Sequence, residues 1–123
     1  MANSIIVLTN KPELSYVSEK QKGDGYYGNA DGLHTMSFHV HDFTGRIHLE
    51  ATIVDEPTEN DWFNIGLTQE EDYFEFTSQT TTVGTTFQGN FVYLRVSIDR
   101  DYLGDSEYSV ATHGIFDKAV LLI

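Results

Sequence analysis

The sequence predicts an all-β fold, an antiparallel, jelly-roll-like β-sandwich. Three observations predict it: apolar and polar residues alternate along several segments, turn-forming residues separate these segments, and no segment of useful length has the period of a helix. The 123 residues suffice for one hydrophobic core but not for two. We therefore expect residues 1–123 to form a single domain, with an N-terminal strand and a long turn-rich loop in residues 1–32 and the main sandwich in residues 33–123.

The N-terminal part contains one clear strand signal. Residues 5–8 form a continuous apolar run rich in β-branched side chains, and Pro12 shortly afterwards interrupts any further ladder. Residues 20–32 are dense in Gly, Asn and Asp, which favour turns. We expect a first strand that ends near Thr9, followed by a long loop that contains a short strand at residues 26–27.

The clearest alternation lies in residues 33–41 and 46–54, which we expect to form the two strands of a hairpin. The turn between them is predicted at residues 42–45, with Gly45 as its turn-forming glycine. In such strands every second side chain faces the core. The side chains predicted to face inward are Met36, Phe38 and Val40 in the first strand and Ile47, Leu49, Ala51 and Ile53 in the second.

The second half of the chain predicts further short strands at residues 62–67, 73–77, 79–83 and 91–99. The last of these follows a bend at Gly89, and its apolar face consists of Val92, Leu94, Val96 and Ile98. Residues 115–123 are mostly apolar, so they would fray and aggregate unless they were paired. We therefore expect the final strand to lie inside the sheet.

Composition excludes several functions. The chain has 19 acidic and 7 basic residues and a net charge of −12, so we expect neither nucleic acid nor membrane as a partner. It lacks cysteine, which removes disulfides, thiolate nucleophiles and Cys-based zinc sites. The sequence has no phosphate-binding loop, no nucleophile elbow and no His-Glu-x-x-His zinc motif. We expect a soluble protein that is not an enzyme and has no catalytic residues and no cofactor.

Two sets of side chains are candidate metal ligands. If the predicted hairpin forms, His39 faces His48 across it, and His41 lies on the same outer face, so that two imidazoles could share a transition metal. This set lacks a third ligand at fixed reach, and exposed histidines on a polar strand face are common. A second set could offer oxygen ligands to calcium but does not match the EF-hand pattern. It consists of Asp99, Asp101, Asp105 and Glu107. The simpler interpretation, that these side chains are solvated, predicts no bound metal.

Aromatic side chains suggest a second kind of function. A group of exposed rings can stack against a sugar, as in many β-sandwich modules that bind carbohydrate. The alternative for Trp62 is a place in the core, because it begins an apolar run directly after an acidic loop. The candidates for ligand stacking are Trp62, Tyr73 and Tyr93, with Tyr26, Tyr27 and Tyr102 as further rings.

Four short segments carry a resemblance to a known group of proteins. They are Phe38-x-Val40-x-x-Phe43-x-Gly45-x-Ile47-x-Leu49-x-Ala51, Glu56-Pro57-x-x-x-Asp61-Trp62-Phe63-x-Ile65, Phe87-x-Gly89-x-Phe91-Val92-x-Leu94-Arg95-Val96 and Gly114-x-Phe116-x-Lys118-x-x-Leu121. Over residues 33–123 the chain resembles small virion structural proteins of contractile-tailed phages that infect marine cyanobacteria.

The resemblance implies a non-enzymatic structural or assembly protein, displayed in several copies on the head, neck, tail or fibre of a phage particle. It would be made in the host cytoplasm and located in the virion, with other virion proteins as partners and no cofactor. We also expect a homo-oligomer, because the strand at residues 5–8 or the C-terminal strand could pair between chains. The alternative function is a carbohydrate-binding β-sandwich module that attaches to a host surface through its aromatic side chains.

Overall fold

The computed structural model describes residues 4–23, 25–27, 32–66 and 73–122. Within these residues the chain consists mainly of antiparallel strands, with three short helical turns between residues 59 and 113. The strands are β1 (Ser4–Thr9), β2 (Tyr16–Val17), β3 (Gln21–Lys22), β4 (Leu33–Thr52), β5 (Phe63–Asn64), β6 (Tyr73–Gln88), β7 (Tyr93–Asp99) and β8 (Ile115–Leu122). The helical turns are η1 (Glu59–Asp61), η2 (Asp101–Leu103) and α1 (Val110–His113). The structure describes no helix with the length and apolar character needed to cross a bilayer.

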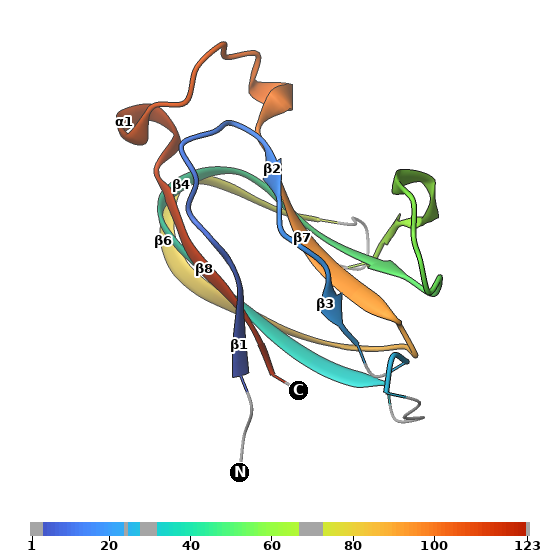
Figure 1. Ribbon diagram of the computed structural model, residues 1–123. Coiled ribbons are helices and arrows are strands. Elements are labelled where there is room, and N and C mark those ends of the chain that lie inside the picture. The colour runs from blue at the N-terminus through green and yellow to red at the C-terminus, as the bar shows by residue number, and fades with distance from the viewer. Residues whose placement is uncertain (1–3, 24, 28–31, 67–72, 123) are drawn as a thin grey trace.

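The strands form one antiparallel sheet that curls over itself and encloses the core (Figure 1). Its main order is β1-β8-β4-β7-β2, with β3 on β7 and with β5 and β6 on β4. The first part of β4 pairs with β8 and the second part with β7, so the two layers are continuous through this long strand. The predicted all-β, antiparallel sandwich is therefore confirmed, in the form of a single curled sheet.

The predicted hairpin is wrong, because residues 33–52 form one strand that bends. The buried positions change phase at the bend, from Phe38 and Val40 to Phe43 and Ile47. This change comes from two register shifts in the β4–β6 pairing, which are β-bulges rather than a turn. A bulge inserts one unpaired residue into a strand, so it shifts an alternating pattern just as a turn does.

Strand β6 follows β4 around the same bend, so the strands predicted at residues 73–77 and 79–83 are one strand. The bend is marked by left-handed backbone at Asp42 (φ 49°) on β4 and at Ser78 (φ 48°) on β6. Gly45 belongs to the bend, with φ 154°, and a Cβ there would lie 2.9 Å from the Cγ of Arg100. Its glycine identity is thus explained by backbone conformation and by close packing, but not by a hairpin turn.

The core contains the side chains that the alternation predicted, with two exceptions. Ile53 was expected to face inward but is 68% exposed, because it lies beyond the end of β4, and Val92 is only half-buried. The buried apolar residues are Val7, Leu8, Tyr16, Met36, Phe38, Val40, Phe43, Ile47, Leu49, Ala51, Phe76, Phe87, Leu94, Val96, Ile98, Phe116, Ala119 and Leu121. They come from both layers and confirm the inward faces of the long strands.

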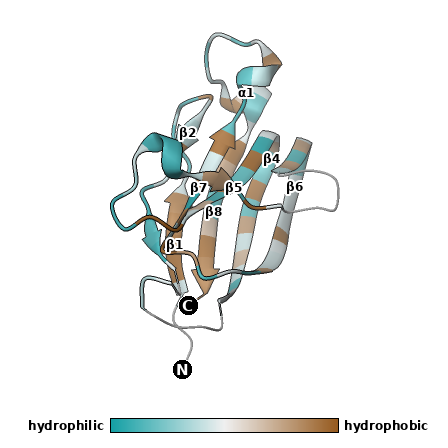
Figure 2. Cartoon of the chain, turned by 90° about the vertical axis from the view of Figure 1, so that its right-hand side faces the viewer, coloured by the Kyte–Doolittle hydropathy of each residue, from teal (hydrophilic) through white to brown (hydrophobic). Residues whose placement is uncertain are grey.

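The C-terminal strand lies inside the sheet, as predicted, since β8 has β1 on one side and β4 on the other. Both of its edges are therefore used within the chain, and the expectation that it could pair between chains is wrong. In Figure 2, β8 is largely hydrophobic, whereas the segment that carries η1 is hydrophilic.

Three local predictions also need correction. Of the strand expected at residues 62–67, only β5 is a strand in the structure, and it pairs with β4. Residues 67–72 lie outside the described residues. Tyr26 and Tyr27 lie in a turn and not in a strand. The N-terminal part contributes β2 and β3 instead, which both pair with β7.

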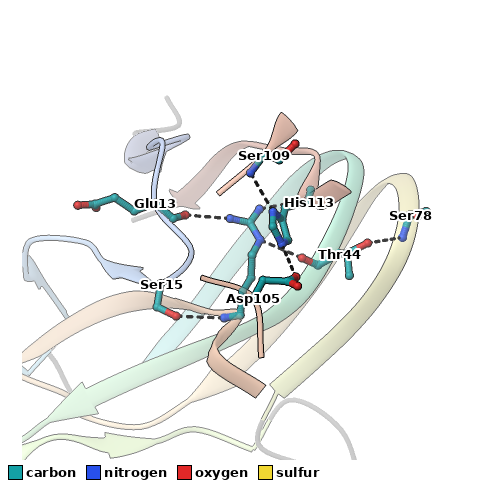
Figure 3. A network of polar contacts seen from close by, with 8 residues as sticks. Glu13, Ser15, Thr44, Ser78, Asp105, Ser109 and His113 are labelled. Carbon is teal, nitrogen blue, oxygen red and sulfur yellow. Dashed lines mark hydrogen bonds and ion pairs between the residues drawn. The ribbon is translucent and has the colours of Figure 1, made fainter. Parts of the chain in front are cut away.

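A fully buried arginine holds one end of the sandwich together. Arg100 directly follows β7, and its guanidinium donates hydrogen bonds to three backbone carbonyls from separate segments (Figure 3). The acceptors are Thr44 (2.9 Å from Nε), Glu13 (3.1 Å from Nη1) and His113 (3.3 Å from Nη2). The guanidinium also lies 4.6 Å from the ring centre of Phe43 and 5.2 Å from that of Tyr108. Burial lowers its pKa, but an arginine remains charged under these conditions.

Candidate functional site

The outward face of β7 carries the best candidate for a binding site. Along this strand Leu94, Val96 and Ile98 are buried in the core, and the alternate side chains face the other way. The outward row is Tyr93, Arg95, Ser97 and Asp99. Three hollows lie along this row, and we call the surface that contains them the β7 surface. With seven residues, β7 extends over about 20 Å.

The first hollow lies at Ser97 and Asp99 and has a volume of about 370 Å³. β4 contributes His48 and Glu50 to its lining, and β5 contributes Asn64. Such hydroxyl, amide, imidazole and carboxylate groups offer both donors and acceptors in one place. The hollow is open to solvent and polar, so it suits a hydrated ligand rich in hydroxyl groups.

The acidic side of this hollow is held in place by short hydrogen bonds. The Oδ1 atom of Asp99 accepts a bond from the backbone N–H of Asp101 at 2.9 Å. The hydroxyl of Ser15 donates to Asp101 at 2.8 Å, which joins the N-terminal segment to the end of β7. The Nε2 atom of His48 lies 3.9 Å from an oxygen of Asp99.

The second hollow lies at Arg95 and has a volume of about 450 Å³. The Arg95 guanidinium lies 4.2 Å from the ring centre of Trp62, which forms part of the wall. It donates to Glu50 at 2.7 Å from Nε and to Glu59 at 3.1 Å from Nη2. The segment that carries Glu59 and Trp62 projects from the sheet beside β7 (Figure 1).

These ion pairs shift the pKa values of the groups involved. The hydrogen bond from Arg95 lowers the pKa of the Glu59 carboxyl. Burial alone would lower the pKa of the Arg95 guanidinium, but the hydrogen bonds to Glu59 and Glu50 outweigh it and raise that pKa. Glu59 and Arg95 therefore stay charged at neutral pH, and the ion-paired cluster orients Trp62 through its stacked guanidinium.

The third hollow lies at the Tyr93 end and has a volume of about 380 Å³. The Nζ atom of Lys20 lies 4.6 Å from the ring centre of Tyr93, and that of Lys22 lies 4.6 Å from the ring centre of Tyr26. The rings of Tyr26 and Tyr93 are themselves in contact, with centres 5.7 Å apart. This hollow combines aromatic rings with ammonium groups.

A further pair of aromatic rings lies around Arg46 on the outer face of β4. The guanidinium of Arg46 lies 4.0 Å from the ring centre of Tyr102 and 4.6 Å from that of Tyr73. It also donates from Nε to Glu75 at 2.6 Å, and this hydrogen bond raises the pKa of Arg46. Burial raises the pKa of the Tyr102 phenol.

The three predicted stacking residues lie on the same outer side of the sheet. Trp62 and Tyr93 line hollows of the β7 surface, and Tyr73 lies opposite His48, which lines the first hollow. All three rings are half-buried, and each has a cation near one face. Trp62 is not among the buried core residues, so the alternative that placed it in the core is wrong.

The histidines do not form the site that the hairpin prediction required. His39 and His48 lie on opposite sides of the bend in β4, where His39 faces Thr82 and His48 faces Ser97. Within the described part of the chain, no group of three or more His, Asp or Glu side chains is placed to hold a metal ion. The imidazole of His39 is within 3.2 Å of the Thr82 hydroxyl, while the exposed His41 lies 3.4 Å from Asp42.

The four carboxylates considered as calcium ligands lie in separate surroundings and make separate contacts. Asp99 and Asp101 border the first hollow, whereas Asp105 contacts the buried His113 with Oδ2 and Nε2 2.8 Å apart. Glu107 is exposed in the loop that follows η2. These carboxylates therefore do not converge on a common point.

Sequence reasoning missed most of the polar side chains of the β7 surface, chiefly Glu50, Asn64, Arg95 and Ser97. The alternation in β7 contained a signal for two of them, because a strand with an apolar face at Leu94, Val96 and Ile98 must display the residues between. No pattern in the sequence, however, indicated that β5 and the Glu59 segment would lie beside that face.

Comparisons with known proteins do not assign the chain to a family. No family model and no curated protein matches it. Two solved structures are similar in part: TmCBM61 in complex with beta-1,4-galactotriose (11% identity, TM-score 0.39) and a family 29 carbohydrate-binding module from Piromyces equi (14% identity, TM-score 0.38). Each match covers 98% of this chain. This chain spans 65% of the first structure, which is less than two thirds of its length, and 86% of the second. Similarity at this level establishes neither a common fold nor a common ligand.

Proposed function

We propose that this protein is a non-enzymatic binding module that holds a carbohydrate chain along the β7 surface. The observation that carries the proposal is the row of three hollows along one strand, an elongated arrangement in which each hollow is open to solvent and lined by hydrogen-bonding side chains. A linear oligosaccharide is a ligand of that shape. It offers hydroxyl groups along its edges and apolar C–H faces on its rings.

The chemistry of the second hollow supports this ligand class. The indole of Trp62 gives an apolar surface for a sugar ring, and its orientation is fixed by the stacked Arg95. Charged side chains that are already paired, such as Glu50 and Arg95, still have lone pairs and N–H groups for neighbouring hydroxyls. Rigid, preorganised groups lose little conformational entropy when a ligand binds.

The electrostatics favour binding over hydrolysis. A glycosidase needs one carboxyl group whose pKa is raised, so that it can act as a general acid. The pKa of Glu59 is instead lowered by Arg95, and Glu50 bonds the same guanidinium. A carboxylate pair that shares a guanidinium is suited to orienting a ligand and unsuited to donating a proton.

Replacement of Trp62 tests the proposal. A glycan array with the whole chain identifies an oligosaccharide, and calorimetry then measures its affinity for the wild type and for Trp62→Ala. We expect the variant to bind about tenfold more weakly, because an aromatic contact in a binding site commonly contributes at least that factor.

Phe63→Ala provides the matched control, since Phe63 is the adjacent aromatic residue and is exposed away from the three hollows. The control should retain wild-type affinity. Absence of any bound glycan, or equal losses in the two variants, would contradict the proposal.

A second candidate function is the structural role in a phage virion that the sequence resemblance implies. One observation favours assembly: within the described residues β6 pairs with β4 alone, so its other edge is open. Residues 76–94 contain no charged side chain, although 21% of the chain is charged. Natural edge strands usually carry charges or proline that prevent pairing, and an uncharged edge permits close approach of two acidic copies. The partner would be β6 of a second copy, in a homo-oligomer displayed on the particle.

Gly84→Asp tests this second function. A side chain at Gly84 meets only open space, with its nearest neighbour 4.0 Å away, so the fold should tolerate the change. If copies pair through β6, light scattering should show an oligomer for the wild type and a monomer for the variant. Thr9→Asp on β1, the strand at the other side of the sheet, is the control. A wild-type monomer at high concentration, or dissociation by the control alone, would exclude pairing through β6.

A further inference from the structure

Two lysines of the third hollow differ from the other basic side chains of the β7 surface. Lys20 and Lys22 are two residues apart in an extended segment, so their side chains extend from the same side of it. Each ammonium group lies 4.6 Å from a tyrosine ring centre, Lys20 at Tyr93 and Lys22 at Tyr26. Each of the two positive charges thus lies against one ring of a contacting pair.

The charge around these lysines is not compensated by the residues that the structure describes. Arg46 and Arg95 on the same side of the sheet form ion pairs with glutamates, but neither lysine has a carboxylate within 4.0 Å among those residues. The described lining of the third hollow contains no acidic side chain; it consists of Ile5, Lys20, Gln21, Lys22, Tyr27 and Tyr93. In a chain with 19 acidic and 7 basic residues, two neighbouring lysines with no carboxylate within 4.0 Å in the described part of the chain form an unusual positive region.

We propose that the third hollow is a subsite for the anionic group of an acidic sugar, a carboxylate or a sulfate ester. The inference rests on the proposed function and specifies its ligand class. The sugar ring would lie against the tyrosine rings, while Lys20 and Lys22 would donate charge-assisted hydrogen bonds to the anionic oxygens. Tyr27 is 53% exposed at the rim of the hollow and offers a phenol to the same group.

The subsite extends the sugar-binding row, because Lys20 also lines the second hollow. One side chain thus borders both the hollow that contains Trp62 and the hollow that contains Tyr93. An oligosaccharide with one acidic sugar unit could place that unit at Lys20 and Lys22 while the neighbouring unit contacts Trp62. Glu19 lines the second hollow beside Lys20, so it would disfavour an anion there and restrict the acidic unit to the third hollow.

The experiment compares oligosaccharides that share one backbone and differ only in charge. Calorimetry measures the affinity of an oligogalacturonide and its methyl ester, which tests a carboxylate, and of a galactan oligosaccharide with and without sulfate esters. We expect the wild type to bind one charged form about tenfold more tightly than its neutral form at low salt, because hydrogen bonds to charged groups are stronger than neutral ones. The preference should decrease as ionic strength rises.

The variant Lys20→Gln with Lys22→Gln should bind charged and neutral forms equally, with the affinity that the wild type has for the neutral form. Lys11→Gln with Lys118→Gln removes the same charge away from the three hollows and should retain the preference. The subsite would be overturned if the wild type had no preference for the charged form, or if that preference survived in the Lys20/Lys22 variant. In either case, binding of the neutral sugar would still support the proposed function. A protein that binds neither form of either sugar, and no other glycan on the array, would overturn both.

Discussion

Among single residues, Arg100 shows how a charge can be buried by hydrogen bonds to carbonyl groups, since no carboxylate among the described residues lies within 4.0 Å of it. Each of its three nitrogens donates to one backbone carbonyl oxygen, and Phe43 and Tyr108 lie against the guanidinium. The backbone N–H of Arg100 donates to the hydroxyl of Ser15, which extends the connection to the N-terminal segment. A single side chain thereby links the bend in β4, the N-terminal segment and the loop before β8.

Replacing Arg100 with lysine should be costly, although the charge is preserved. An ammonium group cannot reach three carbonyls in a fixed planar arrangement, so some of them would remain buried without a donor. We expect a loss of about 2 kcal/mol in the free energy of unfolding, measured by urea denaturation. Arg46→Lys on the partly exposed outer face should have a much smaller effect, because solvent screens its ion pair. Equal effects of the two substitutions would show that Arg100 has no special role.

The sequence could predict which residues of the long strands face the core, because burial follows period two directly. It could not predict the role of Arg100, since the three carbonyls that it contacts come from residues 13, 44 and 113. For the same reason, the sequence could suggest the candidate stacking rings Trp62, Tyr73 and Tyr93. It could not predict the cations that lie against them, which are Arg95, Arg46 and Lys20. Side-chain pairs between distant segments depend on the fold and leave no local pattern.

At the scale of elements, the bend shared by β4 and β6 determines the architecture. The sequence of residues 33–54 predicted a turn, but a bulge shifts an alternating pattern by one position in the same way. The turn interpretation was reasonable for a segment with Asp42 and Gly45, but tertiary pairing with β6, β7 and β8 keeps the strand continuous. The position of the bend was thus predictable from the sequence, and its nature was not.

Gly45→Ala tests the importance of this bend. The substitution places a Cβ 2.9 Å from Arg100 and 3.1 Å from the Phe43 ring, on backbone that other residues rarely adopt. We expect it to destabilise the protein by about 2 kcal/mol in urea denaturation. Gly84→Ala in β6 is the control, since its Cβ meets open space, and it should be neutral or slightly stabilising. A neutral Gly45→Ala would contradict this account of the bend.

At the scale of the whole molecule, the curled sheet separates two kinds of surface. One is the β7 surface, where the aromatic rings and four of the basic side chains gather: Lys20, Lys22, Arg46 and Arg95. The other is the outer face around β6 and β8, with a long uncharged edge at β6. Composition and alternation together predicted a single acidic all-β domain, but only the folded chain shows that four of its seven basic side chains lie on one side.

Amide chemical-shift mapping during a glycan titration shows which residues a bound carbohydrate contacts, so it tests directly whether the β7 surface binds it. The titrated sugar is the oligosaccharide that binds best on the array, and the protein is the whole wild-type chain. We expect the largest amide chemical-shift changes in Tyr93–Asp99 and at Trp62 and Asn64. The amides of β8 and of residues 79–88 should change little. Changes centred on β6 or β8, with β7 unaffected, would contradict this expectation.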